Sequence, residues 1–417
     1  MKKIVLYCHD NLWFWHISRT LNIYHALKNS FEVYIIIWGK VPEEHFQWVS
    51  YIALPHIEEI NIFNSHRVSE SLMDMRKNKM QRFIDEFQPD VLGIDYFPFG
   101  RIWLQPEIDF LMRQVKKKPW SKVYSYMRDI FSGEICVRKE DIQWVREKIE
   151  DYFGEDFSYI LRYSFFKLYQ YIKTSNISKT TLSQLLLEQY LNENTLDGIL
   201  VFWDKKYYVL EDEFSLCQNH RDKFFYLWYL LPQRYPKILD IPSISEKKYI
   251  LLSFWGSIFH RKNFIRIMKI LSFQKEYTIK CMIPFFQSEN YKKIFEYFSH
   301  DSNIEFHKFS WDFFLYLQNA DFFVSGWGYW STMDILYYQI PSLIVLNYNQ
   351  NIEINKTEDG KRVEIFNSFF PVYKYTEDMT SIDILKILQH SKNQKRNWDS
   401  QILNSSWDVN LRDFLSM

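Results

Sequence analysis

The segment Gly326–Leu336 combines residue types that suit the binding of a phosphate group. A strand that ends in a glycine-flanked turn and opens a helix presents free backbone N–H groups and the positive end of a helix dipole. An apolar run, Asp321–Ser325, leads into such a turn here. We expect two hydroxyls to donate to phosphate and a carboxylate to accept from a ribose or sugar hydroxyl, although the glycines could serve only the turn. The candidate residues are Gly326, Gly328, Tyr329, Ser331, Thr332 and Asp334.

A second segment, Ser253–Ser257, offers groups of the same kind. It follows an apolar run, and three potential cations lie shortly after it, at His260, Arg261 and Lys262. Hydroxyls, a glycine and cations suit a diphosphate, while a solvated basic surface explains the same residues equally well. The candidate ligands are Ser253, Gly256, Ser257 and Arg261.

The loop from His9 to Arg19 contains a potential general base. It follows the first apolar run and opens a helical pattern, the position where loops of doubly wound domains face a ligand. His16 could accept a proton near neutral pH, and Asp10 and Arg19 would lie on the same side, with Arg19 free to pair with an anionic group. A histidine that only caps or packs is the competing interpretation. The loop lacks the Gly-x-Gly-x-x-Gly pattern of a dinucleotide site.

Two further strand ends carry charged residues. Asp95 and Arg101 flank an aromatic turn that contains Pro98, and Arg128 precedes Asp129 after another apolar run. Asp95, Arg101 and Arg128 could face a substrate. Alternatively, the aromatic residues of the turn only fill the space between a strand and a helix. For Arg128, the alternative is a structural ion pair with Asp129.

Composition limits the functional classes. With 51 basic and 51 acidic residues among 417, the chain lacks the basic excess of a nucleic-acid-binding protein. Four dispersed cysteines form no metal-binding spacing, so we expect reduced thiols and a cytoplasmic protein. The N-terminus suggests a first strand and not a signal peptide, and no apolar segment reaches the roughly 18 residues of a spanning helix. Peripheral membrane contact stays open.

Short apolar runs alternate with helical patterns, which predicts βαβ units and parallel sheets. The predicted strands are 4–7, 31–37, 90–95, 122–126, 197–202, 249–253, 278–283, 303–306, 321–325 and 342–346. A helical, charged section at about 140–190 interrupts the first set, and a linker containing proline spans 236–246. We therefore expect domains at 1–235 and 247–417, with the option that the C-terminal helix packs back on the first.

With these segments in order, the chain resembles the GT-B glycosyltransferases, and within them the predicted transferases allied to the peptidoglycan-precursor N-acetylglucosaminyltransferase (family 28-like). His16–Arg19 resembles the family's His-x-x-Arg, and Asp95–Gly100 and Arg128–Ile130 resemble two later segments. Gly326–Asp334 is similar to the Gly-Gly-Tyr-Asn-Thr-x-x-Glu turn, with Asp in place of Glu. The resemblance implies two Rossmann-like doubly wound domains facing a central cleft.

The resemblance also implies a hexosyltransferase that moves a sugar from a nucleotide-diphosphate donor, expected to be UDP-linked, to a hydroxyl acceptor without metal or cofactor. His16 would be the base, and the two segments of the second domain would hold the donor. The acceptor could be a glycan, a lipid-linked molecule or a small molecule. Two alternatives remain: a non-catalytic nucleotide-sugar-binding protein, suggested by the aromatic loop at Trp13 and Trp15, and a sugar-nucleotide epimerase of the same fold.

Overall fold

A computed structural model places most of the chain in two α/β units. The residues it describes are 1–9, 15–38, 46–55, 70–100, 102–127, 139–175, 177–206, 208–213, 215–230, 248–253, 261–283, 294, 296–308, 313–326, 329–345, 362–363, 365–366, 371–392 and 407–417. The first unit comprises Met1–Gln233 and Ser406–Met417, and the second comprises Arg234–Ser405. Each unit is described by itself.

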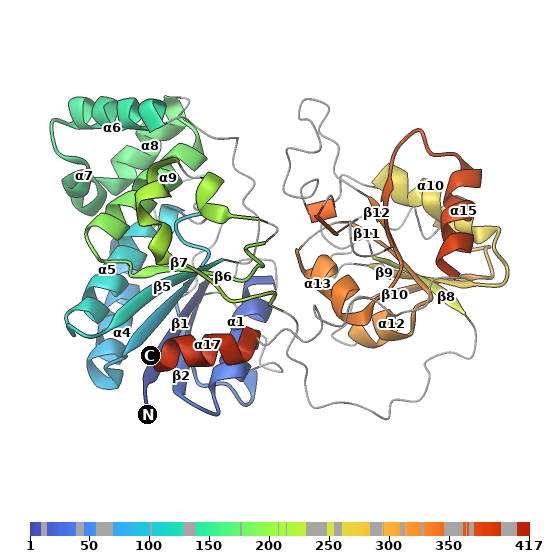
Figure 1. Ribbon diagram of the computed structural model, residues 1–417, viewed down its shortest axis with the longest axis horizontal. Helices are drawn as coiled ribbons and strands as arrows, with labels where there is room; N and C mark the ends of the chain where they lie inside the picture. Colours follow the sequence, from blue (N-terminus) through green and yellow to red (C-terminus); the bar gives the residue numbers. More distant parts are fainter. Residues whose placement is uncertain are drawn as a thin grey trace. The chain divides into compact units, whose positions relative to one another are not determined.

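The first unit, part of which is labelled in Figure 1, is built on a seven-stranded parallel sheet. The order of its strands is β3-β2-β1-β4-β5-β6-β7. Its strands are nearly continuous apolar runs; every residue of β4 and β6 is buried. Strands of this kind belong to sheets that are covered on both faces. The strands are β1 Lys3–His9, β2 Glu32–Trp38, β3 Tyr51–Leu54, β4 Val91–Asp95, β5 Lys122–Met127, β6 Gly198–Val201 and β7 Phe224–Tyr226.

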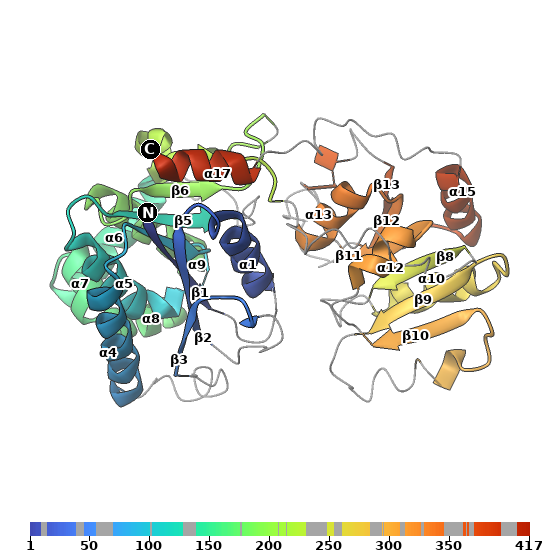
Figure 2. The same cartoon turned by 90° about the horizontal axis from the view of Figure 1, so that it is seen from below.

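Helices cover both faces of this sheet, with α1 on one side and α4 and α5 on the other (Figure 2). Successive side chains of a strand point to opposite faces. Tyr7 therefore points towards α5, where it contacts Glu107, while Asp95 points towards α1, where it contacts His16. The helices are α1 Trp15–Leu27, α4 Glu70–Phe87 and α5 Gln105–Lys116, with 3-10 turns at Ile102–Leu104, Leu210–Glu213 and Ser215–Lys223.

The helical section predicted at about 140–190 is present as four helices. They are α6 Lys139–Phe153, α7 Phe157–Tyr163, α8 Phe165–Thr174 and α9 Lys179–Asn192. Two of them begin at residues that cap helix N-termini well: the Asp156 carboxylate accepts from Tyr159 N at 2.9 Å, and the Ser178 hydroxyl accepts from Thr181 N at 3.1 Å.

Helix α17 (Trp407–Ser416) belongs to the first unit and packs on it. Lys2 Nζ donates to Leu415 O at 2.9 Å and to Ser416 O at 3.0 Å, and so satisfies carbonyls that the helix end leaves open. The ring of Phe414 lies 4.6 Å from that of Phe225 between centroids. The chain therefore leaves the first unit, forms the second and returns.

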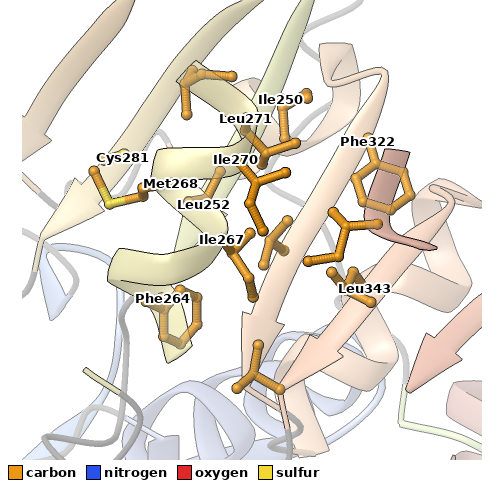
Figure 3. Close-up of a cluster of buried hydrophobic side chains, with 14 of the residues drawn as sticks. Ile250, Leu252, Phe264, Ile267, Met268, Ile270, Leu271, Cys281, Phe322 and Leu343 are labelled. Atoms are coloured by element: carbon orange, nitrogen blue, oxygen red, sulfur yellow. The ribbon is translucent and has the colours of Figure 1, made fainter. Parts of the chain in front are cut away.

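The second unit contains a six-stranded parallel sheet in the order β10-β9-β8-β11-β12-β13. One face packs against α10 and α15 through a buried apolar cluster that includes Leu252, Ile267 and Phe322 (Figure 3). The strands are β8 Tyr249–Ser253, β9 Thr278–Ile283, β10 Ile304–Lys308, β11 Phe322–Gly326, β12 Ser342–Val345 and β13 Val372–Tyr375. The helices are α10 Arg261–Ser272, α12 Phe313–Asn319, α13 Tyr329–Tyr338 and α15 Ser381–Lys392.

His25 on α1 makes the stability of the first unit dependent on pH. Burial, and then the charge of Lys28, lowers the pKa of His25 from 6.5 to about 4. The unfolded chain therefore binds a proton at His25 more readily than the folded chain does. Above pH 6.5 this costs the folded state nothing, and as the pH falls from 6.5 towards 4 the free energy of unfolding decreases.

We expect wild type to lose about 1 kcal/mol more than His25→Gln between pH 7.5 and 5.0, a value reduced to allow for the partial exposure of the ring. Urea unfolding of both proteins at the two pH values measures the difference. An equal loss in the two proteins would show that His25 does not carry this dependence.

Candidate functional site

The first turn of α1 brings His16 and Arg19 to the end of strand β4. The two residues are three apart on a helix and so share one face. Strand β1, which precedes α1, pairs in parallel with β4 through Ile4↔Val91 to Tyr7↔Ile94. The helix that follows β1 therefore begins beside Asp95, the last residue of β4.

Asp95 and His16 form a hydrogen-bonded pair. His16 Nδ1 contacts Asp95 Oδ2, and the Asp95 side chain has no exposed surface while that of His16 is 17% exposed. Arg19 Nε lies 3.2 Å from Asp95 Oδ1, so the carboxylate also has a cationic partner. An ionised carboxylate only accepts hydrogen bonds, which places the imidazole proton on Nδ1. A histidine in this tautomer would take a proton from a substrate through Nε2.

Arg19 is buried against this pair, with 2% of its surface exposed. Its Nη2 lies 3.2 Å from His16 Nδ1, and its guanidinium carbon lies 5.8 Å from the centre of the Tyr96 ring. Neither its Nε nor its Nη1 makes a hydrogen bond to the described residues, so the contact with Asp95 Oδ1 is an ion pair. The anionic group that Arg19 contacts is thus Asp95 of the chain itself.

The turn after β4 fixes the position of the Tyr96 ring. Tyr96 adopts a φ of 56°, which is uncommon for a residue with a bulky side chain. Its N donates to Tyr126 O at 3.1 Å, and its O accepts from Gly100 N at 2.9 Å. A Cβ on Gly100 would lie 2.8 Å from the Tyr96 ring, so only glycine leaves room for it. The ring is thereby held 6.4 Å from the His16 ring, centroid to centroid.

Tyr126 of β5 packs beside the His16–Asp95 pair. Its hydroxyl lies 2.8 Å from Thr20 Oγ1, and its ring passes over Gly93, where a Cβ would approach the ring to 3.4 Å. Burial, and then the charge of Asp95, raises the pKa of Tyr126 well above its usual range. Tyr126 therefore stays a neutral phenol.

In the second unit, the strand, turn and helix predicted around Gly326 are present. Strand β11 ends at Gly326 and α13 begins at Tyr329. Ser253 at the end of β8 pairs with Ser325 of β11. Ser325 Oγ lies 3.4 Å from Ser331 Oγ in the first turn of α13.

The predicted ligands on α13 differ in exposure. Ser331 and Asp334 are partly exposed, whereas Thr332 has no exposed surface, and Ser253 is 2% exposed. Hydroxyl groups and the N-terminus of α13 therefore lie at one edge of this sheet, and such groups can hold an anion. At Gly326, a Cβ would make only an ordinary contact, at 4.0 Å from Val345 O.

Several predicted site residues lie outside the described residues: Asp10, Arg101, Arg128, Gly256, Ser257 and Gly328. Arg261 and Tyr329 are the first residues of α10 and α13, and their side chains lie outside the described part. These assignments remain predictions.

Three structural features were not predicted from the sequence. They are the hydrogen bond between His16 and Asp95, the ring of Tyr96 beside it, and Ser325 beside Ser331. The first follows from topology: with β4 placed next to β1, the end of β4 lies under the start of α1. No sequence signal points to Tyr96, because its role depends on its backbone conformation.

Within the described parts of the chain, no helix is long and apolar enough to span a membrane. Over the same residues, no cluster of three or more His, Cys, Asp or Glu side chains could hold a metal ion. Cys8 and Cys281 are buried and form no disulfide, while Cys136 and Cys217 lie outside the described side chains.

Several solved structures have a similar fold, and each match covers nearly the whole chain. The glycotransferase of kitacinnamycin is 12% identical, with a TM-score of 0.58, and the match covers 99% of this chain and 95% of that one. UDP-GlcNAc 2-epimerase from Methanocaldococcus jannaschii is 12% identical, with a TM-score of 0.60 and coverage of 100% and 99%. MurG from Acinetobacter baumannii is 9% identical, with a TM-score of 0.51 and coverage of 99% of both chains.

No family model matches the sequence, and no curated protein matches it either. At these identities the likeness establishes the fold, which is GT-B: two parallel-sheet α/β units of seven and six strands. The resemblance to GT-B glycosyltransferases seen in the sequence is confirmed at this level. Function does not follow from fold, because one fold hosts many reactions.

Proposed function

We propose that the protein is a glycosyltransferase that moves a sugar from a nucleotide-diphosphate donor to a hydroxyl group of an acceptor. The observation that carries the proposal is the His16–Asp95 pair. It presents one ring nitrogen as a base and uses the other to fix the tautomer, and it lies at the carboxyl edge of a parallel sheet, where ligands of α/β folds bind.

In the proposed reaction, His16 Nε2 takes the proton from the acceptor hydroxyl. The acceptor oxygen forms a bond to the anomeric carbon, and the bond to the leaving diphosphate breaks with its electron pair on the diphosphate oxygen. Asp95 stabilises the imidazolium that forms, because its carboxylate is hydrogen-bonded to Nδ1. The N-terminus of α13 and the Ser331 hydroxyl stabilise the charge on the leaving group, without a metal ion.

We propose a UDP-linked donor that binds to the second unit. Among structures with this fold are a UDP-GlcNAc 2-epimerase bound to UDP-GlcNAc and UDP, and a UDP-glucosyltransferase from Polygonum tinctorium. This support comes from the fold, and the following screen identifies the sugar. A thermal-shift screen of nucleotide diphosphates and their sugars identifies the donor, because a ligand raises the melting temperature according to its occupancy.

Turnover distinguishes the transferase from a binding protein. With the best donor from the screen, release of the nucleoside diphosphate is measured with and without a panel of glycan, lipid-linked and small-molecule acceptors. Acceptor-dependent release supports the proposal. Binding without release across the whole panel would favour a non-catalytic nucleotide-sugar-binding protein.

Asp334→Ala is expected to weaken binding of the identified donor about tenfold. Asp334 is partly exposed on α13 and is proposed to accept a hydrogen bond from a ribose or sugar hydroxyl, and such a bond contributes roughly 1–1.5 kcal/mol. Isothermal titration calorimetry measures the affinity.

Asp383→Ala is the matched control. Asp383 lies in the first turn of another helix of the same unit, where it accepts from Thr380 N at 2.8 Å. Its loss should leave donor affinity unchanged. If Asp334→Ala and Asp383→Ala both bind as tightly as wild type, Asp334 is not a donor ligand.

A sugar-nucleotide epimerase is the second candidate, because the fold is shared with a UDP-GlcNAc 2-epimerase at a TM-score of 0.60. The two reactions leave different products. An epimerase acting on its nucleotide sugar without an acceptor yields a different sugar, whereas a transferase releases the nucleoside diphosphate only as sugar reaches an acceptor or water. NMR spectroscopy of the donor after incubation separates the two.

A further inference from the structure

Arg19 places a positive charge beside the proposed base, His16. Its side chain is 2% exposed, and it contacts both members of the His16–Asp95 pair: Nε lies 3.2 Å from Asp95 Oδ1, and Nη2 lies 3.2 Å from His16 Nδ1. A guanidinium is always charged in proteins. A buried positive charge is therefore fixed beside the imidazole.

We propose that Arg19 is a positioning residue that keeps His16 a neutral imidazole, and so a competent base, by neutralising Asp95 and by placing a positive charge beside Nδ1. This deepens the proposed function and rests on it for its catalytic meaning. The charge arrangement itself stands on the geometry of α1 and β4.

The two effects of Arg19 act in the same direction. A carboxylate hydrogen-bonded to Nδ1 favours the imidazolium, and neutralising that carboxylate weakens this preference. A cation 3.2 Å from Nδ1 disfavours the imidazolium directly. Without Arg19, the guanidinium no longer compensates the charge of the buried Asp95 carboxylate. His16 would then hold a proton at higher pH, where it cannot act as a base.

The other described side chains placed around the pair are hydroxyls and a thiol. Tyr96 faces it from the turn after β4, Tyr126 from β5, and Thr20 from α1. Cys8 of β1 is a buried thiol, and it is one of the groups that raise the pKa of Tyr126. Asp95 and Arg19 are charged groups that contact His16 directly.

The test measures the protonation of His16 directly in the full-length protein. Histidine labelled with ¹⁵N is incorporated, and the His16 signal is assigned as the one missing in His16→Gln. Arg19→Gln is expected to raise the pH midpoint of His16 by about 1 to 3 units. Arg19→Lys keeps the charge and should leave the midpoint within about half a unit of wild type.

Arg113→Gln is the matched control. Arg113 pairs with Asp109 at 3.0 Å and with Glu193 at 2.9 Å in the same unit, away from the His16–Asp95 pair, so its loss should not move the midpoint. An Arg19→Gln midpoint equal to that of wild type, in a protein that melts cooperatively, would overturn the proposal.

A second variant keeps the proposal testable if Arg19→Gln does not fold. Asp95→Asn leaves Arg19 beside His16 without the carboxylate, and the midpoint should fall below that of wild type. An unchanged or raised midpoint would again overturn the proposal.

These titrations need no donor or acceptor. A protein that transfers no sugar but shows both shifts refutes the proposed function alone, and a protein that transfers sugar without the shifts refutes the role of Arg19 alone.

Discussion

Replacement of His16 by glutamine is expected to lower the rate of sugar transfer by about 10²- to 10⁴-fold, the usual contribution of a general base. The protein should remain folded, because Arg19 still compensates the Asp95 charge at 3.2 Å and the glutamine amide can donate to Asp95 in place of Nδ1. Donor affinity should not change, since the proposed donor ligands belong to the second unit. Initial rates with saturating donor, together with calorimetry of donor binding, measure both quantities.

His25→Gln is the control for this substitution. His25 is on the same helix, so the change replaces a histidine of α1 without touching the His16–Asp95 pair. Its turnover at pH 7.5 should stay within about twofold of wild type. Full activity in His16→Gln would remove His16 from the role of base, and loss of donor binding in the same variant would point to a structural defect.

The strands in the interior of both sheets could be predicted from the sequence, but three edge strands could not. Strands β3, β7 and β13 have three or four residues and lie at sheet edges. An edge strand has one neighbour only, so fewer of its residues are buried than in an interior strand. Strand β3 shows the burial that results, with Tyr51 exposed and Leu54 buried.

The candidate site could be predicted as separate residues but not as an arrangement. His16 and Asp95 each follow from their positions beside the ends of apolar runs. Their hydrogen bond requires the order β2-β1-β4, which places two distant segments side by side. A sequence alone does not give the order of strands in a sheet. The ion pair of Arg19 was missed for the same reason: its partner Asp95 lies 76 positions further along the chain.

The first unit contains two buried ion pairs with different consequences, one at the end of β4 and one between α4 and α5. The Asp95 pair includes His16, which keeps some exposure. The second pair, Arg76 with Glu107, has no exposed side-chain surface on either residue. A fully buried ion pair with every polar atom engaged contributes to the fold and leaves nothing for a substrate.

Glu107→Gln is expected to destabilise the first unit by about 3 to 5 kcal/mol, because it leaves a buried guanidinium without a counter-charge. Arg76 Nε donates to Glu107 Oε2 at 2.6 Å and Nη2 donates to Oε1 at 2.7 Å, while Tyr7 OH donates to Oε1 at 2.6 Å. Burial, and then the charge of Glu107, raises the pKa of Tyr7, which remains a donor. Urea unfolding at pH 7.5 measures the loss.

Two comparisons show whether burial causes this loss. Arg221 and Asp212 form an ion pair at 2.5 Å in which both side chains are more than half exposed, so Asp212→Asn should cost less than about 1 kcal/mol. The double variant Arg76→Met with Glu107→Leu removes both charges, and should recover most of the stability that Glu107→Gln loses, because no charge is left unpaired. If the double variant is as unstable as Glu107→Gln, the lost packing and the Tyr7 hydrogen bond, and not the uncompensated charge of Arg76, account for the destabilisation.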